Sequence, residues 1–565
     1  MSGLLWCAWL LAAPIADGTE SGFDVLLRGG RVVDGSGNPW FHADVAISHG
    51  EIVAVGNLAA AKATTILDVT GLTIAPGFID MMGQSALTIL VDPRGESKLR
   101  QGVTTEVQGE GFSPAPMSDY WRADNKDFLE HFKLTADWNN LDQYFKRIDQ
   151  LKPGFNIATT VGHTTVRTTV LGGASRPPTS AELDAMKKLV AEAMVDGALG
   201  LGSAIEYAPG SYSATDELIE LAKVAAQYGG VYTTHMRSEA LYAAGAAGVS
   251  IFDALDEALR IGREAHLPVE IHHLKAAGEQ TFGKMPELVK RIDAARASGL
   301  DVTANVYPYL AGATSLSACV PKWAHEGGLE KLLEHLRDGA LRARIKDGIL
   351  SGEGKGAFFG AGAADRVLIA SVQNSALKKY QGRKLSAIAA ELSRDPADVV
   401  IELLLQDRAQ TGMTVFLMRE DDMRLALAQP WVQFCTDYNA EALDGPLYEG
   451  QLAHPRAFGT YPRILGQYVR EAKLLTLEEA VRKSTFAAAQ RVGLHDRGLL
   501  RQGFAADVVV FDAAKILDAA TFEQPGVFPD GVVHVLVNGV LAVRDGKLTG
   551  ERGGRALRGP AWKKG

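Results

Sequence analysis

Short apolar runs alternate with amphipathic helical stretches through the middle of this chain. The stretches at residues 181–197 and 216–230 each carry an apolar stripe at helical spacing and end at glycine. Strands separated by helices predict an α/β fold with a parallel sheet, because each parallel pair of strands needs a crossover connection. Eight strand-like runs predict a (β/α)8 barrel. The runs end near Asp80, Glu110, His163, Ser203, His235, His273, Tyr307 and Asp437.

The two ends of the chain follow a different pattern, in which short strands are separated by glycine-rich turns. Both ends alternate Val, Ile and Leu with polar residues, which is typical of antiparallel strands. We therefore expect residues 22–74 and 498–550 to build one small β-sandwich and residues 75–497 to build the barrel. A glycine- and charge-rich stretch at 310–364 follows the seventh strand-like run. We expect it to form a small inserted subdomain over the mouth of the active site.

The N-terminus carries an apolar run, Leu4 to Ala16, that ends in small residues before Asp17. It is too short to span a bilayer and matches the hydrophobic region of a signal peptide. We therefore expect residues 1–16 to be removed and the protein to be periplasmic or secreted. No Lys or Arg precedes the run, so a cytoplasmic protein with a misplaced start codon or a buried strand is the alternative.

Charge and composition narrow the classes of partner. The 565 residues carry a formal net charge of −9 without a long basic run, which argues against nucleic acid as a partner. Hydrophobic residues make up 47% and charged residues 22%, which predicts a globular protein without a stable membrane span. Cys319 and Cys435 lie far apart, so no disulfide framework is indicated. The sequence is compatible with a homo-oligomer and does not indicate the oligomeric state.

Polar side chains close several of the strand-like runs, at the end of a (β/α)8 barrel where active sites lie. His235 ends one run, the pair His272 and His273 ends the next, and Asp437 ends the last. Two imidazoles and a carboxylate are a donor set that zinc and other first-row metals accept. A single histidine is more often a hydrogen-bonded structural residue, but three such residues at corresponding strand ends favour a metal site. The alternation of side chains along a strand does not decide between His272 and His273.

A series of motifs runs through the chain in a fixed order. They are APGFID (75–80), LVDPRGESKLRQGVTTEV (90–107), VGHTTVR (161–167), EYAPGSY (206–212), THMRSE (234–239), HHLKAAG (272–278), VYPYLAG (306–312), HPRAFGTYPRIL (454–465) and GFAADVVVFD (503–512). On these motifs the chain resembles the N-acyl-D-amino-acid deacylase, or D-aminoacylase, branch of the amidohydrolase superfamily. The resemblance implies an enzyme that hydrolyses a C–N amide bond with a metal-activated water. It also implies that His235, His273 and Asp437 belong to the metal centre, since the family's ligand is the histidine before Leu-Lys.

Two positions depart from the resembling family. Where the superfamily usually has His-x-His after the first strand, this chain has MGQ at 82–84, and Glu110 stands where the family has a metal-binding cysteine. Loss of the histidine pair removes one of two metal subsites. The remaining donors are Glu110, His235 and His273, a two-histidine, one-carboxylate set like that of mononuclear zinc hydrolases. We therefore expect one divalent ion, with zinc as the default. A barrel that has lost its metal and now binds a ligand or partner is the competing interpretation.

The expected centre gives roles to neighbouring side chains. Asp437 would accept the proton of the water and pass it to the leaving amine. His163 or Tyr207 would help the ion to stabilise the oxyanion, although His163 is equally explained as a core residue or as support for a metal ligand.

An N-acyl amino acid, the substrate that the resemblance implies, carries a carboxylate. Its binding requires a cationic side chain near the metal. Lys275 and Arg237 follow His273 and His235 by two positions, so each points to the same side of a strand as its histidine. Either can instead be a solvated or helix-capping charge. Tyr207 and Tyr307 shape the pocket or are only packing residues. The candidates for substrate binding are therefore Lys275, Arg237, Tyr207 and Tyr307. The predicted function is metal-dependent deacylation of N-acyl-D-amino acids, with a cyclic amide, a small peptide or a lipidic or aromatic amide as the alternative small-molecule substrate.

Overall fold

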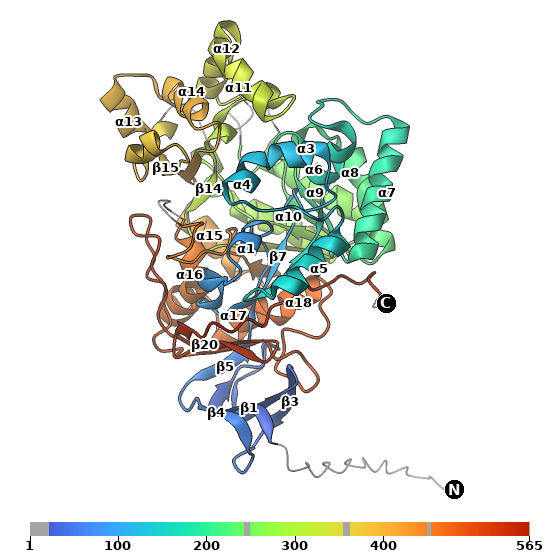
Figure 1. The fold of residues 1–565 in the computed structure, drawn as a ribbon, viewed down its shortest axis with the longest axis vertical. Coiled ribbons are helices and arrows are strands. Elements are labelled where there is room, and N and C mark those ends of the chain that lie inside the picture. The colour runs from blue at the N-terminus through green and yellow to red at the C-terminus, as the bar shows by residue number, and fades with distance from the viewer. Residues whose placement is uncertain (1–21, 242–248, 354–361, 449–451, 453, 564–565) are drawn as a thin grey trace.

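The computed structural model of the protein describes residues 22–241, 249–353, 362–448, 452 and 454–563. Figure 1 shows three parts along the long axis: a strand-rich part, a central barrel, and a mostly helical part at the other end. The candidate site lies where the barrel meets the helical part, because residues of both line the same cavity.

Eight parallel strands close the barrel, as the sequence predicts. β6, β7 and β8 form one sheet, and β9 to β13 with β17 form another. Backbone hydrogen bonds join them: Thr160 N donates to Gln108 O at 3.0 Å, and Met81 N donates to Phe434 O at 3.2 Å. β8 and β9 together act as one strand, interrupted at Thr160. The strands are β6 (Phe78–Asp80), β7 (Val103–Gln108), β8 (Asn156–Thr159), β9 (Val161–Gly162), β10 (Gly200–Ala204), β11 (Val231–His235), β12 (Val269–Ile271), β13 (Val302–Val306) and β17 (Val432–Phe434).

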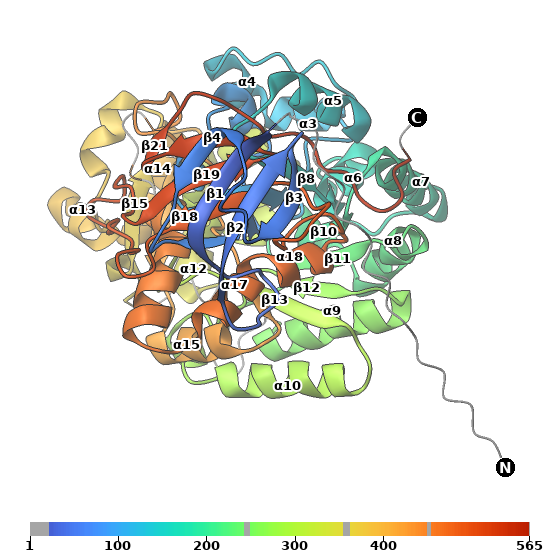
Figure 2. The ribbon, with the colours of Figure 1, turned by 90° about the horizontal axis from the view of Figure 1, so that it is seen from below.

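Helices that alternate with these strands cover the outside of the barrel, as Figure 2 shows from below. Both helices predicted from the sequence, α7 and α8, are present. Thr179 and Glu182 form a capping box that starts α7, and Gly197 at φ 116° ends it. The apolar faces of these helices pack with the strands in one hydrophobic core. The helices include α7 (Ser180–Asp196), α8 (Thr215–Gln227), α9 (Ile251–Ala265), α10 (Met285–Ala297) and α15 (Glu420–Ala428).

Both ends of the chain share one nine-stranded sheet, as the two strand-rich ends predict. The antiparallel pairing of β5 with β18 joins the N-terminal strands to the C-terminal ones. Val508 and Val510 of β18 pack into the core of this sheet, while Val509 and Phe511 pack into the barrel core. β18 therefore ties the sheet to the barrel. The strands are β1 (Phe23–Val32), β2 (Phe41–Ser48), β3 (Glu51–Gly56), β4 (Ala63–Asp68), β5 (Thr73–Pro76), β18 (Val508–Phe511), β19 (Val532–Val537), β20 (Val540–Arg544) and β21 (Lys547–Leu548).

The inserted part follows the seventh strand of the barrel and has its own sheet and core. β14 (Ala311–Ser315) and β15 (Val367–Ser371) both pair antiparallel with β16 (Gly412–Phe416). The part therefore continues to β16, past residue 364 where the sequence pattern ended it, because β14 finds its strand partner much later in the chain. Its helices, which pack around the second hydrophobic core, are α11 (Leu329–Arg337), α12 (Gly339–Ser351), α13 (Leu385–Leu392) and α14 (Pro396–Gln406).

The expected signal peptide, residues 1–16, lies outside the described residues. Among the helices of the described part, none combines the length and the apolar character needed to cross a membrane. Cys319 and Cys435 are both buried and carry free thiols.

Candidate metal centre

A cavity of about 420 Å³ lies at the carboxyl ends of the barrel strands. Residues of β14, β15 and β16 line one side of it, among them Thr314 and Met413. The inserted part therefore helps to enclose the site. Seven of the nine side chains singled out from the sequence also line this cavity: Glu110, Tyr207, His235, His273, Lys275, Tyr307 and Asp437.

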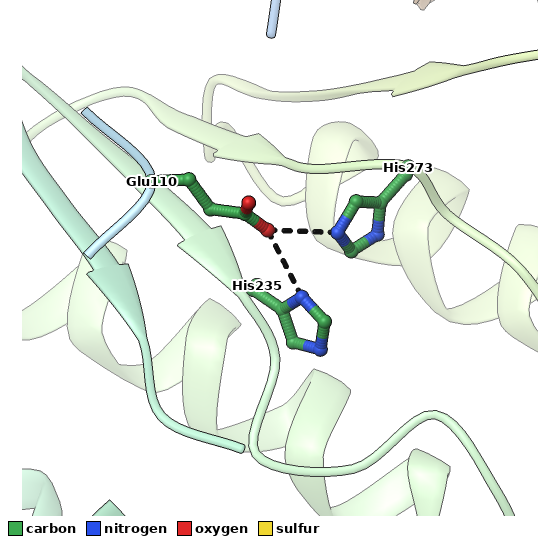
Figure 3. A group of neighbouring side chains, drawn as sticks. All are labelled: Glu110, His235 and His273. Carbon is green, nitrogen blue, oxygen red and sulfur yellow. Dashed lines mark hydrogen bonds and ion pairs between the residues drawn. The ribbon is translucent and has the colours of Figure 1, made fainter. Parts of the chain in front are cut away.

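Glu110, His235 and His273 meet at the centre of this group (Figure 3). Glu110 Oε1 lies 2.9 Å from His235 Nδ1 and 2.8 Å from His273 Nε2. The three ligand atoms lie within 4.8 Å of one another. His273, rather than the adjacent His272, therefore faces Glu110.

The local backbone explains how these side chains converge. His235 ends β11, and His273 follows β12 with a positive φ of 33°, which turns the chain after the strand. Glu110 follows β7 between Gly109 and Gly111, whose φ values are 100° and 71°. A Cβ at Gly111 would lie 2.6 Å from the backbone N of Ala204, so only glycine lets this turn pack against β10.

The electrostatics of the group favour a bound cation. Burial alone would raise the pKa of Glu110, but hydrogen bonds from His235 and His273 outweigh it and hold the pKa well below its usual value. Burial would likewise lower the pKa of His235, but the charge of Glu239 and hydrogen bonds to Glu110 and Glu206 raise it to about 10. The carboxylates thus favour positive charge at this point, whether it is a proton or a metal ion.

Two of these carboxylates were not assigned a role from the sequence. Glu206 Oε2 lies 2.9 Å from His235 Nε2, and Glu239 Oε1 lies 3.0 Å from His273 Nδ1. Each contacts the ring nitrogen that does not face Glu110, as the outer partners of metal-binding histidines do. Both lie inside motifs quoted above, but no periodicity or spacing pairs them with the histidines. Glu206, His235 and Glu239 form a second group of possible ligands.

Asp437 stands apart from the ligand group. It follows β17 in a left-handed conformation, φ 49°, and its backbone N–H donates to Met82 O at 2.9 Å. Its Oδ2 lies 2.7 Å from Nη1 of Arg456, a buried residue that the sequence reasoning missed. In the described residues Asp437 is not among the groups whose ligand atoms come together. The structure therefore does not group the Asp437 carboxylate with the ligand atoms of Glu110, His235 and His273.

Lys275 and the two tyrosines complete the cavity wall. Lys275 Nζ lies 2.5 Å from Glu239 Oε1 and 2.8 Å from His273 Nδ1. The ring of Tyr207 lies 5.0 Å from that of His235, and the ring of Tyr307 lies 4.5 Å from the Arg456 guanidinium.

His163 and Arg237 lie outside the cavity, which corrects the roles expected for them. His163 Nε2 lies 2.9 Å from Glu217 Oε1, and Glu217 also pairs with the buried Arg167. Arg237 donates from Nε and Nη2 to the two carboxylate oxygens of Glu257, both at 2.8 Å. Carboxylates on α8 and α9 therefore hold both side chains in structural ion pairs.

The donor set fits a divalent metal ion. A carboxylate and two imidazoles suit zinc and similar metals. Glu110, Glu206 and Glu239 bring three negative charges, and Lys275 brings one positive charge. One divalent cation would therefore neutralise the contacting side chains, whereas a second would leave two positive charges unbalanced.

Fold and site together define a (β/α)8-barrel hydrolase with a metal centre at the carboxyl ends of its strands. The chain belongs to the amidohydrolase family, whose model matches residues 65–543. It is 35% identical to a D-aminoacylase of Alcaligenes xylosoxydans xylosoxydans, over 95% of this chain and 97% of the relative. These findings confirm the resemblance drawn from the motifs.

Two solved structures extend this similarity. A D-aminoacylase with a binuclear metal centre, activated by one metal and attenuated by the second, has a TM-score of 0.78 at 33% identity, covering 95% of this chain and 100% of the other. An N-acyl-D-glutamate deacylase of Bordetella bronchiseptica, bound to zinc and a phosphonate mimic of the tetrahedral intermediate, has a TM-score of 0.77 at 29% identity with the same coverage. The chain is thus an amidohydrolase similar to N-acyl-D-amino-acid deacylases over nearly its whole length.

Proposed function

We propose that the protein hydrolyses the amide bond of N-acyl-D-amino acids with a single zinc ion held by Glu110, His235 and His273. The convergence of Glu110 Oε1 with the two imidazole nitrogens carries this proposal. The deacylase activity and the D configuration come from the relatives, and the single ion follows from the charge of the site.

The chemistry divides between the ion and the chain. When bound, the ion supplies a Lewis acid that polarises the amide carbonyl and lowers the pKa of water. Hydrolysis joins the water oxygen to the carbonyl carbon and breaks the C–N bond. Asp437 accepts the proton of the water and returns it to the amine nitrogen that leaves. Burial raises the pKa of Asp437 although Arg456 opposes this, which makes the carboxylate a stronger base.

Three side chains of the cavity wall are the proposed partners of the substrate carboxylate. Lys275 and Arg456 are the two Lys or Arg side chains among the described residues that line the cavity. The buried Tyr307 hydroxyl has no hydrogen-bond partner within the described part of the chain and is a donor for the same carboxylate. Arg456 therefore takes the role that the sequence pattern gave to Arg237.

The ring of Tyr207 lies 5.0 Å from the ring of His235. Burial raises its pKa well above the usual value, so its hydroxyl stays protonated. It is the proposed donor to the oxyanion that forms as water adds to the carbonyl.

The experiment compares zinc-loaded protein on N-acetyl-D- and N-acetyl-L-amino acids. We expect hydrolysis of the D forms, and loss of activity when a chelator removes the ion. Asp437→Asn should keep its zinc and lose at least about a hundredfold in kcat, because general acid–base catalysis contributes that much. Asp444→Asn, in an exposed ion pair with Arg94, is the matched control. Equal rates on both enantiomers, full activity without metal, or an Asp437→Asn variant at the parent rate would each contradict the proposal.

A further inference from the structure

We propose that Gln84 keeps the centre mononuclear: its side-chain amide occupies the outer oxygen of Glu110 and thereby excludes a second cation. This inference rests on the proposed metal centre and goes beyond it, because it names the residue that limits the number of ions.

Gln84 reaches the centre from the loop after β6. Its backbone N–H donates to Tyr438 O at 3.1 Å, and the preceding Gly83 N donates to Val107 O at 2.8 Å. Backbone hydrogen bonds therefore hold this loop to β7 on one side and to the loop after β17 on the other. From this position Gln84 lines the cavity, and its Nε2 donates to Glu110 Oε2 at 2.7 Å.

The two oxygens of Glu110 thus have separate partners. Oε1 faces His235 Nδ1 and His273 Nε2, whereas Oε2 accepts from Gln84. A carboxylate only accepts hydrogen bonds, so the Gln84 amide must present its NH2 group and turn its carbonyl oxygen away. A second cation on Oε2 would meet the amide hydrogens, which carry partial positive charge. The same bond holds Glu110 as a ligand through one oxygen.

The carboxylates around Gln84 already have cationic side chains as partners. Asp80 Oδ2 and Glu106 Oε2 lie 2.5 Å and 2.9 Å from Lys98 Nζ, so a buried ammonium already occupies that side of the barrel. Asp437 pairs with Arg456. Among the described residues near Gln84, each of these carboxylates therefore already contacts a buried cation, and Lys98 balances one of the two charges of Asp80 and Glu106.

Variants of Gln84 test this without relying on activity. Gln84→Glu replaces the donor by a carboxylate that faces Glu110, and we expect it to raise bound zinc from one to two ions per chain. Gln84→Ala frees Glu110 Oε2, and we expect affinity for the first zinc to fall about tenfold, as for other partners of metal ligands. Asn439→Ala is the matched control, since this amide also lines the cavity but contacts Glu441 and not Glu110. The readouts are elemental analysis at buffered free zinc and competition with a chromogenic chelator.

The outcomes separate this inference from the proposed function. Two zinc ions in the parent, or one ion in Gln84→Glu together with parental affinity in Gln84→Ala, would overturn the role of Gln84 and leave the zinc hydrolase intact. A parent that binds no zinc, or a Glu110→Ala variant that keeps it, would refute the metal centre and this inference with it.

Discussion

The buried carboxyl of Glu270 is linked to the metal centre through Asn305. Its ionisation should make the folding stability of the protein depend on pH. Its Oε1 accepts a hydrogen bond from Asn305 Nδ2 at 2.8 Å, and Asn305 Oδ1 accepts one from the backbone N–H of His273 at 2.8 Å. Burial raises the pKa of Glu270 to about 7, because desolvation outweighs the opposing effects of Arg491, Thr303 and Asn305.

Replacement of Glu270 by Gln removes this ionisation while keeping an acceptor for Asn305. Between pH 4.5 and about 7 the unfolded chain releases a proton that the folded protein keeps, so folding stability falls as the pH rises. The stabilisation is complete below pH 4.5 and is lost as the pH rises through about 7. The interval from 4.5 to about 7 corresponds to about 3 kcal/mol, at about 1.4 kcal/mol per pH unit.

The assay is thermal unfolding of parent and Glu270→Gln from pH 4.5 to pH 8.5, followed by circular dichroism. The Tm of the variant relative to the parent should rise with pH by about 3 °C in total, if the barrel unfolds as one unit with about 2 cal/mol/K of entropy per residue. Glu192→Gln, in an exposed ion pair with Lys188, is the control and should show no comparable trend. A difference in Tm that stays constant across the range would refute the raised pKa.

The remaining predictions concern the centre and the N-terminus. Glu110→Ala should lose metal and activity, and Glu110→Cys should restore a metal donor; a Glu110→Ala variant with parental zinc content and rate would end the single-ion proposal. Glu206→Gln should lower zinc affinity about tenfold in chelator competition, because the charge beside His235 Nε2 is removed; unchanged affinity would count against its positioning role. If residues 1–16 are a signal peptide, N-terminal sequencing of protein from the native host should begin near Asp17, and an intact cytoplasmic form would exclude export.

The architecture can be predicted from the sequence because the patterns that mark strands and helices involve residues close together in the chain. The alternation of strands and helices predicted the barrel, and polar residues at strand ends placed Glu110, His235 and His273 at one face. All strands of a parallel barrel end at the same face. Residues at the strand ends therefore converge at that face once the order of strands and helices is known. The motifs then supplied the choice of His273 over His272, which periodicity alone left open.

The tertiary structure decides which charged side chains line the cavity and which are held in ion pairs outside it. His163 and Arg237 also follow strands, but their partners, Glu217 and Glu257, come from neighbouring helices and turn them away from the cavity. Arg456 enters the site from α16 (Arg456–Arg463), which the strand-end pattern does not include.

The bond from Gln84 to Glu110 and the extent of the inserted part likewise depend on contacts between distant segments. Gln84 and Glu110 lie on loops after different strands, and β14 pairs with β16 although most of the inserted part separates them in the sequence. Hydrophobic periodicity specifies which face of an element is buried. It does not specify which side chain of another element lies opposite, because that depends on how the elements pack.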